Sequence, residues 1–279
     1  MSANSRKRME AFANGETEVK AAASLPEEEP AREEPQPEEA DREAPIVAAS
    51  RTDIGRVRKI NQDALIVSEP LFGVADGMGG HKGGEVASSG LRDLLIAELE
   101  GKEPDPEVLL TAVKRANRRL FIRSQEDEEL RGMGTTLDVL WLGAEKAYIA
   151  HVGDSRVYLL REGALRQVTD DHSMVMEMVR AGLITAEQAA VHPMRNIITR
   201  AVGTENSLDV DILTEDRRAG DIWLLCTDGL HGLVEDEALR DRLTRYAPEQ
   251  AADELLSMAL EAGGHDNVSF VILLDREGA

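Results

Sequence analysis

Short apolar runs of strand length open the part of the chain that follows Pro45. The runs IVAAS, ALIVS and LFGVA begin at residues 46, 64 and 71, and Gly, Asp or Asn bounds each of them. Such runs predict strands, and we expect these three to be neighbours in one sheet. Apolar residues then recur at helical spacing over residues 86–95 and 109–120. This spacing predicts two helices that lie side by side on a sheet.

Alternation of apolar and polar residues returns from Thr135. The runs TTLDVLWL, KAYIAHV and RVYLL are separated by short segments at 143–145 and 153–155, which predicts an antiparallel meander. Residues 170–203 are predicted to be helical and are rich in Met. Further along, the pattern predicts a strand at DIWLLC, two helices over residues 235–262 and a last strand at NVSFVILL. Because strands and helices come in runs rather than in strict alternation, we expect an α+β fold and not a doubly wound parallel sheet.

Composition changes this picture at the N-terminus. The chain has 279 residues, of which 42% are hydrophobic, enough for a substantial core. Residues 27–43 read EEEPAREEPQPEEADRE, without one aromatic or β-branched side chain to bury. We therefore expect residues 1–45 to be a disordered acidic tail, and residues 46–276 to be the folded domain. The tail is interpreted as a solubilising extension, with a regulatory or localising arm as the alternative.

Charge and cysteine content indicate which binding partners and which cellular compartment to expect. With 32 Lys and Arg against 53 Asp and Glu, the net charge of −21 argues against nucleic acid or an anionic membrane as partner. The single cysteine, Cys226, cannot form an internal disulfide, and we expect it to be a small core residue rather than a nucleophile. There is no apolar stretch of about 18 residues to span a bilayer, and no secretory signal is recognised. We expect a cytoplasmic protein.

Four aspartates stand where an apolar strand meets a Gly-rich or polar corner. They are Asp76 in VADGMGG, Asp154 in HVGDSR, Asp228 in LLCTDGL and Asp266 in GGHDNVS. One such aspartate alone indicates a turn, because Asp-Gly and Asp-Asn tolerate positive φ. Four together indicate a site for hard divalent cations, which need carboxylate oxygens converging from different strands. One Cys and six His supply zinc-type ligation poorly.

The glycine-rich stretch DGMGGHKGG does not fit a nucleotide-binding loop. Counted from Gly77, the G-x-G-x-x-G pattern requires glycine at position 82, where Lys82 stands, and no G-K-[ST] follows. A dinucleotide enzyme is therefore a weak alternative. The glycines at 77, 79 and 80 would instead let the backbone approach ions and substrate closely.

Eight motifs occur in one order over about residues 50–275. They are RTDIGRVRKINQDA, FGVADGMGGHKGGEVAS, GMGTTL, AHVGDSRVYLLR, VTDDHSMV, ITRAVG, TDGL and GGHDNVSFVIL. In order and spacing they resemble the metal-dependent protein phosphatases of the PPM family, also called type 2C, in their bacterial form. The resemblance implies a central antiparallel β-sandwich flanked by helices on both faces, a four-layer αββα arrangement. It also implies a helical flap at about residues 170–203.

Further implications of the resemblance concern a binuclear site for Mn²⁺ or Mg²⁺ at one end of the sandwich. Asp76 resembles the ligand that bridges the two ions, and Gly77 resembles the residue that supplies a backbone carbonyl. Asp228 and Asp266 resemble the remaining protein ligands. Asp154 resembles the carboxylate that, together with Asp228, holds a third and weaker metal in some members.

Two more positions match family residues that lie where the substrate phosphate and the metals bind. Arg58 matches the family arginine that grips the substrate phosphate, and Asp63 lies in the motif beside the metals. The implied activity is hydrolysis of phosphoserine and phosphothreonine by direct attack of a metal-activated water. Two metals suit this reaction, whose enzymatic acceleration reaches about 10²¹-fold, because they activate water and clamp both reacting oxygens. The expected partners are phosphorylated proteins, including a serine/threonine kinase and its substrates, and we expect a monomer.

Departures from the family pattern qualify the expected site. Met78 stands where eukaryotic members have the histidine proposed as general acid, and Gln62 stands where many members have Glu. Gly232 occupies a position where some members have an acidic residue, which weakens the case for a third metal. His172 is interpreted as a turn or helix-cap neighbour rather than a substrate contact. The flap methionines are interpreted mostly as packing residues rather than as an adaptable substrate surface.

Two other functions remain open at this point. One is a catalytically weak member that binds phosphorylated partners through the same groove, and the other is a phosphatase of small phosphoesters. Retention of Asp76, Asp228, Asp266 and Arg58 favours activity, because a binding module would not need an intact metal cage. None of the motifs indicates a site that binds a peptide, so a phosphatase of small phosphoesters stays an alternative.

Overall fold

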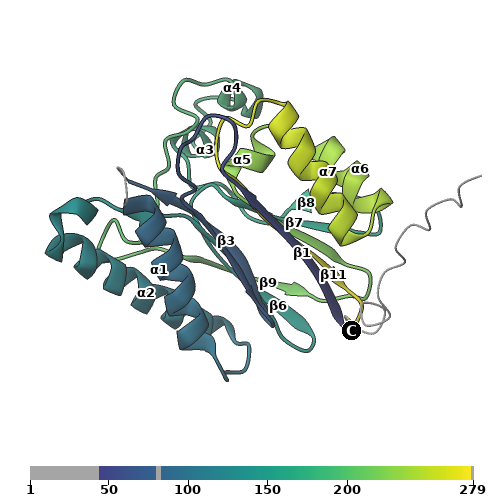
Figure 1. Ribbon diagram of the computed structural model, residues 1–279, viewed down its shortest axis with the longest axis horizontal. Coiled ribbons are helices and arrows are strands. Elements are labelled where there is room, and N and C mark those ends of the chain that lie inside the picture. Colours follow the sequence, from purple (N-terminus) through teal and green to yellow (C-terminus); the bar gives the residue numbers. More distant parts are fainter. Residues whose placement is uncertain (1–43, 80–82, 278–279) are drawn as a thin grey trace, which may run out of the picture. The chain divides into compact units, whose positions relative to one another are not determined.

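The computed structural model describes residues 44–79 and 83–277 (Figure 1). The predicted tail, residues 1–45, lies outside this part of the chain except for its last two residues, and the boundary at residue 46 stays a prediction. Among the described residues, no helix is both long enough and apolar enough to cross a membrane.

Two antiparallel sheets form the centre of the fold. One sheet has the order β1-β11-β10-β7-β8, and the other has the order β2-β3-β5-β6-β9, with β4 paired to β3. The strands of the first sheet are β1 (Ile46–Asp53), β7 (Arg156–Arg161), β8 (Ala164–Gln167), β10 (Ile222–Cys226) and β11 (Val268–Asp275). Those of the second are β2 (Asp63–Ser68), β3 (Leu71–Met78), β4 (Gly134–Thr135), β5 (Leu137–Leu142), β6 (Lys146–Val152) and β9 (Asp211–Asp216).

Helices cover the outer face of each sheet (Figure 1). The second sheet is covered by α1 (Gly83–Leu99) and α2 (Pro106–Glu126), and the first by α6 (Asp236–Arg245) and α7 (Pro248–Glu261). Shorter helices lie in the connections: η2 (Glu128–Leu130), α3 (Met174–Arg180), α4 (Ala186–Ala190) and α5 (Asp228–His231). The predicted α+β fold and its four αββα layers are confirmed.

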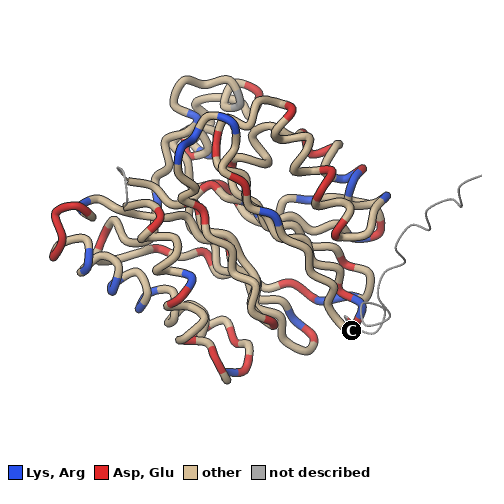
Figure 2. The backbone as a smooth tube through the Cα atoms, in the orientation of Figure 1, with Lys and Arg blue, Asp and Glu red and all other residues tan. Residues whose placement is uncertain are grey.

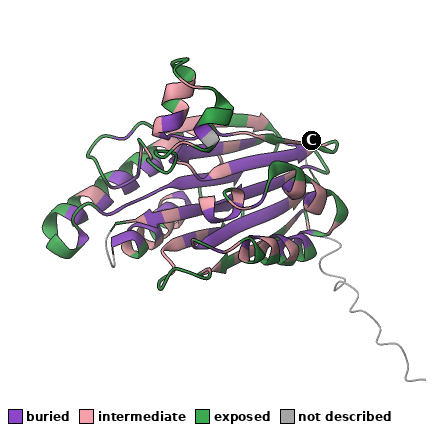
Figure 3. Ribbon diagram, turned by 90° about the horizontal axis from the view of Figure 1, so that it is seen from above, coloured by how far each residue is buried: buried purple, intermediate pink, exposed green. Residues whose placement is uncertain are grey.

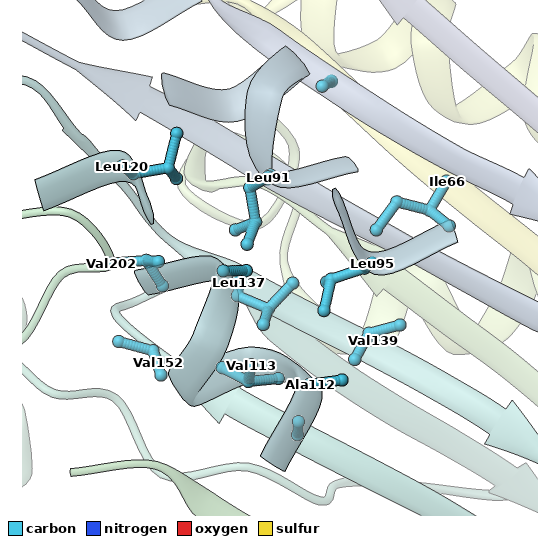
Figure 4. Packing of buried hydrophobic residues seen from close by; sticks show 14 of the residues in the cluster. Ile66, Leu91, Leu95, Ala112, Val113, Leu120, Leu137, Val139, Val152 and Val202 are labelled. Carbon is cyan, nitrogen blue, oxygen red and sulfur yellow. The ribbon is translucent and has the colours of Figure 1, made fainter. Parts of the chain in front are cut away.

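Side chains alternate between the two faces along each strand. Three layers of buried apolar side chains therefore lie between the four layers of helices and sheets. On β3, Leu71 and Ala75 pack under α1 and α2, whereas Phe72 and Val74 point to the other sheet. Successive side chains of a strand point to opposite faces, so one strand serves two cores. Figure 4 shows the layer between the second sheet and its two helices, and Figure 3 shows the central strands as mostly buried. Strands covered on both sides explain the nearly continuous apolar runs of the sequence.

The partners of two strands differ from the prediction. β1 does not neighbour β2 and β3 but pairs with β11 in the other sheet, and β7 does not continue the meander but pairs with β10. The connections at 54–62 and 153–155 therefore cross from one sheet to the other. Alternation identifies which side chains are buried but not which strand lies beside them, so the sequence could not reveal these crossings.

Residues 170–203 are less helical than predicted. Only α3 and α4 are helical, and the rest consists of turns and loops with two isolated bridges, Ser173 to Ile198 and Val202 to Thr135. Ser173 caps α3 through its side chain, and Gly182 has a φ of 69° directly after that helix. A glycine in this conformation ends a helix, which explains why the predicted helix stops early.

Candidate metal centre

Five aspartates come together where strands of both sheets end. Asp63 at the start of β2 is directly opposite Asp76 on β3, so their Cβ atoms are about 4.5–5.5 Å apart. Asp228 begins α5 after β10, Asp266 precedes β11, and Asp154 lies in the turn between β6 and β7. The charges of the other four all raise the pKa of Asp76, which places them around it. The structure thus brings together every carboxylate that the sequence singled out.

Mutual repulsion and shielding from water dominate the electrostatics of this cluster. Each of these residues is only partly buried as a whole, but protein atoms surround the carboxyl groups of four of them. This burial, followed by the neighbouring carboxylates, raises the pKa of Asp63 to about 7 and of Asp228 to about 6. Burial and Asp228 raise the pKa of Asp154 to about 7. The pKa of Asp76 lies well above its usual range for the same reasons. A bound cation would remove this penalty.

The donor set fits hard divalent cations. The buried atoms Asp63 Oδ1 and Asp228 Oδ1 have no hydrogen-bond partner in the described structure. As the side chains stand, no three His, Cys, Asp or Glu residues within 44–79 and 83–277 converge closely enough to hold a metal ion. Asp266 explains part of this, because its Oδ2 accepts a bond from Arg58 at 2.6 Å and its Oδ1 one from Asn267 N at 2.8 Å. The two unpartnered buried oxygens still fit a cation site, since an Asp side chain reorients by rotation about two bonds.

Arg58 provides positive charge at the mouth of the cluster. Its side chain is 51% exposed, and its pKa is raised first by the hydrogen bond to Asp266 and also by the charges of Asp76 and Asp228. Arg58 therefore lies within electrostatic reach of the whole cluster. A guanidinium in this position can exchange a carboxylate partner for phosphate oxygens, which it binds in a bidentate manner.

Gly77 brings backbone, without a side chain, against the cluster. Its N–H donates to Gln62 O at 3.1 Å. A Cβ at Gly77 would lie 2.2 Å from Gly84 O and 2.4 Å from Gln62 O, so only glycine fits. Gln62 extends its amide toward Gly79 O at 3.5 Å and contributes no charge to the cluster. Gly80, which was also expected to let the backbone approach ions closely, lies outside the described residues.

Several polar residues that the sequence analysis did not single out hold the site in place. Asn267 donates to Ile54 O and Ile60 O, both at 3.0 Å, and accepts from Gln62 N at 2.9 Å. It thereby closes the loop that carries Arg58. Thr227 Oγ1 donates to Asp63 Oδ2 at 3.1 Å. Each stands beside a predicted ligand in the sequence, which is the only signal that could have revealed it.

Two histidines fix the turn that carries Asp154. The N–H of His172 donates to Gly153 O at 2.7 Å, and Gly153 N donates to His172 Nδ1 at 3.1 Å. His231 Nε2 donates to Asp154 O at 3.0 Å. Burial, and then the neighbouring His151, lower the pKa of His172 to about 4, so its ring stays neutral and Nδ1 accepts. His172 is thus a turn anchor, as expected, whereas Ser173 caps the helix.

Sulfur side chains contribute no nucleophile. Cys226 is fully buried on β10, and burial raises the pKa of its thiol, which confirms the predicted core role. Met78 is half-buried at the end of β3. The flap methionines Met174, Met176 and Met178 are half-buried, and Met194 is 37% exposed.

Metal binding to this cluster predicts a shift in thermal stability. Mn²⁺ at about 100 times its dissociation constant should stabilise the native chain by about 2.7 kcal/mol. For a chain of this size that raises Tm by about 5–11 °C. Differential scanning calorimetry with Mn²⁺ or with EDTA, at matched ionic strength, measures the shift. Equal Tm values in both conditions would argue against a cation site.

Comparisons with known proteins point consistently to one family. The family model described as Protein phosphatase 2C matches residues 56–262. The chain is similar to the serine/threonine protein phosphatase PstP of Mycobacterium tuberculosis, with 39% identity over 227 residues, covering 80% of this chain and 44% of that protein. It therefore spans less than half the length of that relative. It is also similar to the serine/threonine phosphatase stp of Listeria welshimeri, with 37% identity over 245 residues, covering 82% of this chain and 95% of that protein.

Solved structures share the fold. The crystal structure of the M. tuberculosis phosphatase PstP/Ppp has a TM-score of 0.79 and 37% identity, covering 83% of this chain and 99% of that one. A structure of the catalytic domain of PstP in complex with two manganese ions has a TM-score of 0.75 and 36% identity, covering 82% of this chain and 97% of that one.

Proposed function

Because this chain belongs to the protein phosphatase 2C family, we propose that it hydrolyses phosphoserine and phosphothreonine in proteins at a centre of two divalent metal ions. The observation that carries the proposal is the cluster around Asp76, with unpartnered buried oxygens on Asp63 and Asp228. Without cations, such a cluster lowers the stability of the folded chain, and bound cations raise it.

The cluster around Asp76 supports a set of proposed ligands. Asp76, Asp228, Asp266 and the Gly77 carbonyl would hold two Mn²⁺ or Mg²⁺ ions, and Asp154 with Asp228 would hold a third, weaker one. Bound ions of this kind lower the pKa of water and stabilise charge on phosphoryl oxygens. Manganese is supported by the similar catalytic domain of PstP, whose structure is a complex with two manganese ions.

The chain's own residues then act on the substrate. Arg58 exchanges Asp266 for two non-bridging phosphate oxygens and fixes the phosphate in line for attack. Asp63, held at Oδ2 by Thr227, presents the unpartnered Oδ1 as an acceptor for a water hydrogen and so orients that water. Met78 carries no proton to donate to the leaving alkoxide, so we propose that this proton comes from solvent.

Phosphorylated proteins, including a serine/threonine kinase and its substrates, are the partners we propose. The names of the relatives support this class of substrate. We further propose that residues 46–276 form the catalytic domain, with 170–203 as its flap, and that the chain works as a cytoplasmic monomer. A reduced, buried Cys226 is consistent with that compartment.

Two competing functions are separated from the proposal by kinetics. We expect kcat/KM on a phosphothreonine peptide to exceed that on small phosphoesters of similar leaving-group pKa, and acid quenching of the reaction to trap no phosphate on the protein. Higher kcat/KM on the small esters would favour the small-molecule alternative. Tight peptide binding without turnover would favour the phosphoprotein-binding alternative, and trapped phosphoprotein would contradict direct attack by water.

His172 offers a test of how the Asp154 turn is held. Asn places its amide oxygen near the position of Nδ1, so His172→Asn keeps an acceptor for Gly153 N, whereas His172→Gln does not. Loss of such support typically costs about 10–100-fold in metal affinity or activity. We expect His172→Gln to weaken the apparent Mn²⁺ affinity by about 10-fold, and His172→Asn to stay close to wild type. Mn²⁺ titrations of turnover and calorimetric binding measure both variants, and equal losses in the two would refute the hydrogen bond's role.

A further inference from the structure

A cavity of about 340 Å³ opens beside the candidate metal centre. Its walls come from α3, which contributes Glu177, and from the segment 199–209, which contributes Arg200, Thr204, Glu205 and Asp209. None of these residues belongs to the proposed catalytic machinery. The cavity is therefore a second feature of the surface that a protein substrate would meet.

Backbone pairing fixes how far the cavity lies from the metal centre. Thr135 on β4 is opposite Gly77 on β3, and on its other side it exchanges two hydrogen bonds with Val202, at 3.0 and 2.8 Å. The segment beginning the cavity wall is thus two strand spacings, or roughly 10 Å, from Gly77. Around Gly134, the atoms nearest to the place of a Cβ include Thr204 Cγ2 at 2.6 Å and Met78 Cγ at 3.5 Å. Thr204 of the cavity wall therefore lies close to Met78.

A span of roughly 10 Å corresponds to about three residues of extended peptide. A phosphothreonine bound at the centre would place the side chain about three residues away at the mouth of the cavity. Because a protein substrate continues on both sides of its phosphorylated residue, one flank must pass over this wall or over the opposite one.

Charge distinguishes the two walls. Glu177, Glu205 and Asp209 have no ion-pair partner among residues 44–79 and 83–277, and the guanidinium of Arg200 is balanced by Asp211 at 2.9 Å. On the other side of β3 lies the loop between β1 and β2, part of which is blue in Figure 2. It carries Arg56 and Lys59 in addition to Arg58, whose charge is balanced by Asp266 at 2.6 Å. The cavity wall thus has a net negative charge, and the opposite wall a net positive one.

We propose that this cavity is a substrate subsite for Lys or Arg side chains about three residues from the phosphorylated residue. The inference rests on the proposed phosphatase function and specifies its substrate class. Three unpaired carboxylates attract a cationic side chain, while the basic loop across the centre directs that flank away from itself. The thioether of Met78, whose Cγ lies near the same point at Gly134 as Thr204 of the cavity wall, offers no charge to compete.

Four phosphothreonine peptides of equal length test the proposal: one with neutral flanks, one with Arg two and three residues before the phosphothreonine, one with Arg two and three residues after it, and one with Glu at all four positions. We expect one basic peptide to exceed the neutral peptide in kcat/KM by about 3- to 30-fold, because exposed ion pairs are individually weak. The preference should fall in 0.5 M NaCl, since salt screens exposed charges.

A triple variant links the preference to the cavity. Glu177→Gln, Glu205→Gln and Asp209→Asn together should abolish the preference and leave kcat/KM on the neutral peptide unchanged. Glu100→Gln, Glu103→Gln and Glu145→Gln change the net charge equally at the far end of the sandwich, and should retain it.

The possible outcomes distinguish a failure of the subsite from a failure of the proposed phosphatase function. Equal kcat/KM on neutral and basic peptides, or a preference that survives the cavity variant, overturns the subsite and leaves the proposed phosphatase function standing. A preference lost equally in the far-end variant shows a non-local charge effect and also overturns the subsite. Absence of turnover on all four peptides with Mn²⁺ present overturns the proposed function itself.

Discussion

Replacing Asp76 by Asn is expected to reduce metal-dependent turnover by at least about 10³-fold, the largest effect of any single substitution in the site. The charges of the four other carboxylates all act on Asp76, and we propose that its side chain contacts both ions. The amide keeps the size of the side chain but removes the charge that a bridging ligand needs. Steady-state kinetics at saturating Mn²⁺ measures the loss.

The same substitution has an opposite expected effect on the metal-free fold. Burial and like charges raise the pKa of Asp76 well above its usual range, so ionising this group in the folded chain is unfavourable. Asp76→Asn should therefore leave Tm in EDTA unchanged or raised, while Mn²⁺ no longer raises it. Asp93→Asn, at an exposed position on α1, is the control and should keep both turnover and the Mn²⁺ response. Full activity in Asp76→Asn would remove the proposed centre.

Asp138→Ala is expected to lower the free energy of unfolding by about 3–5 kcal/mol, a large part of the roughly 5–15 kcal/mol available to a domain. Asp138 and His151 are fully buried, and Oδ1 lies 2.8 Å from Nδ1. Burial lowers the pKa of His151, but Asp138 more than offsets this, so the net shift is upward. Removing the carboxylate leaves the imidazole buried without its partner.

Urea unfolding followed by circular dichroism measures this cost. Arg131→Gln breaks an exposed pair with Glu128 and should leave the midpoint unchanged. Replacing both buried partners, by Asp138→Leu and His151→Phe, should recover part of the loss, because no polar group is then left unpaired. A single variant as stable as the wild type would show that the pair does not hold the two strands.

Central strands could be predicted from the sequence, whereas two edge strands could not. DIWLLC and NVSFVILL predicted β10 and β11 to within one residue, because strands covered on both faces carry long apolar runs. β8 and β9, at the edges, were missed because ALRQ and DILTED mix apolar and charged residues. The pairing of β1 with β11 joins residues more than 200 positions apart, which no local pattern could reveal.

The candidate site divides in the same way. Asp76, Asp154, Asp228 and Asp266 were predicted because each ends an apolar strand at a polar corner, and the fold brings these corners together. Asn267 was not predicted, since an isolated buried amide has no periodicity and its three bonds join segments distant in the sequence. The candidate ligand positions could thus be predicted from the sequence, whereas the groups that hold them in place could not.

Hydrolysis of a phosphothreonine peptide by the purified chain, in parallel with EDTA, Mg²⁺ and Mn²⁺, tests the central claim most directly. We expect turnover that requires Mn²⁺ or Mg²⁺ and vanishes with EDTA. Turnover that persists in EDTA, or a folded chain that shows none with any metal, would contradict it.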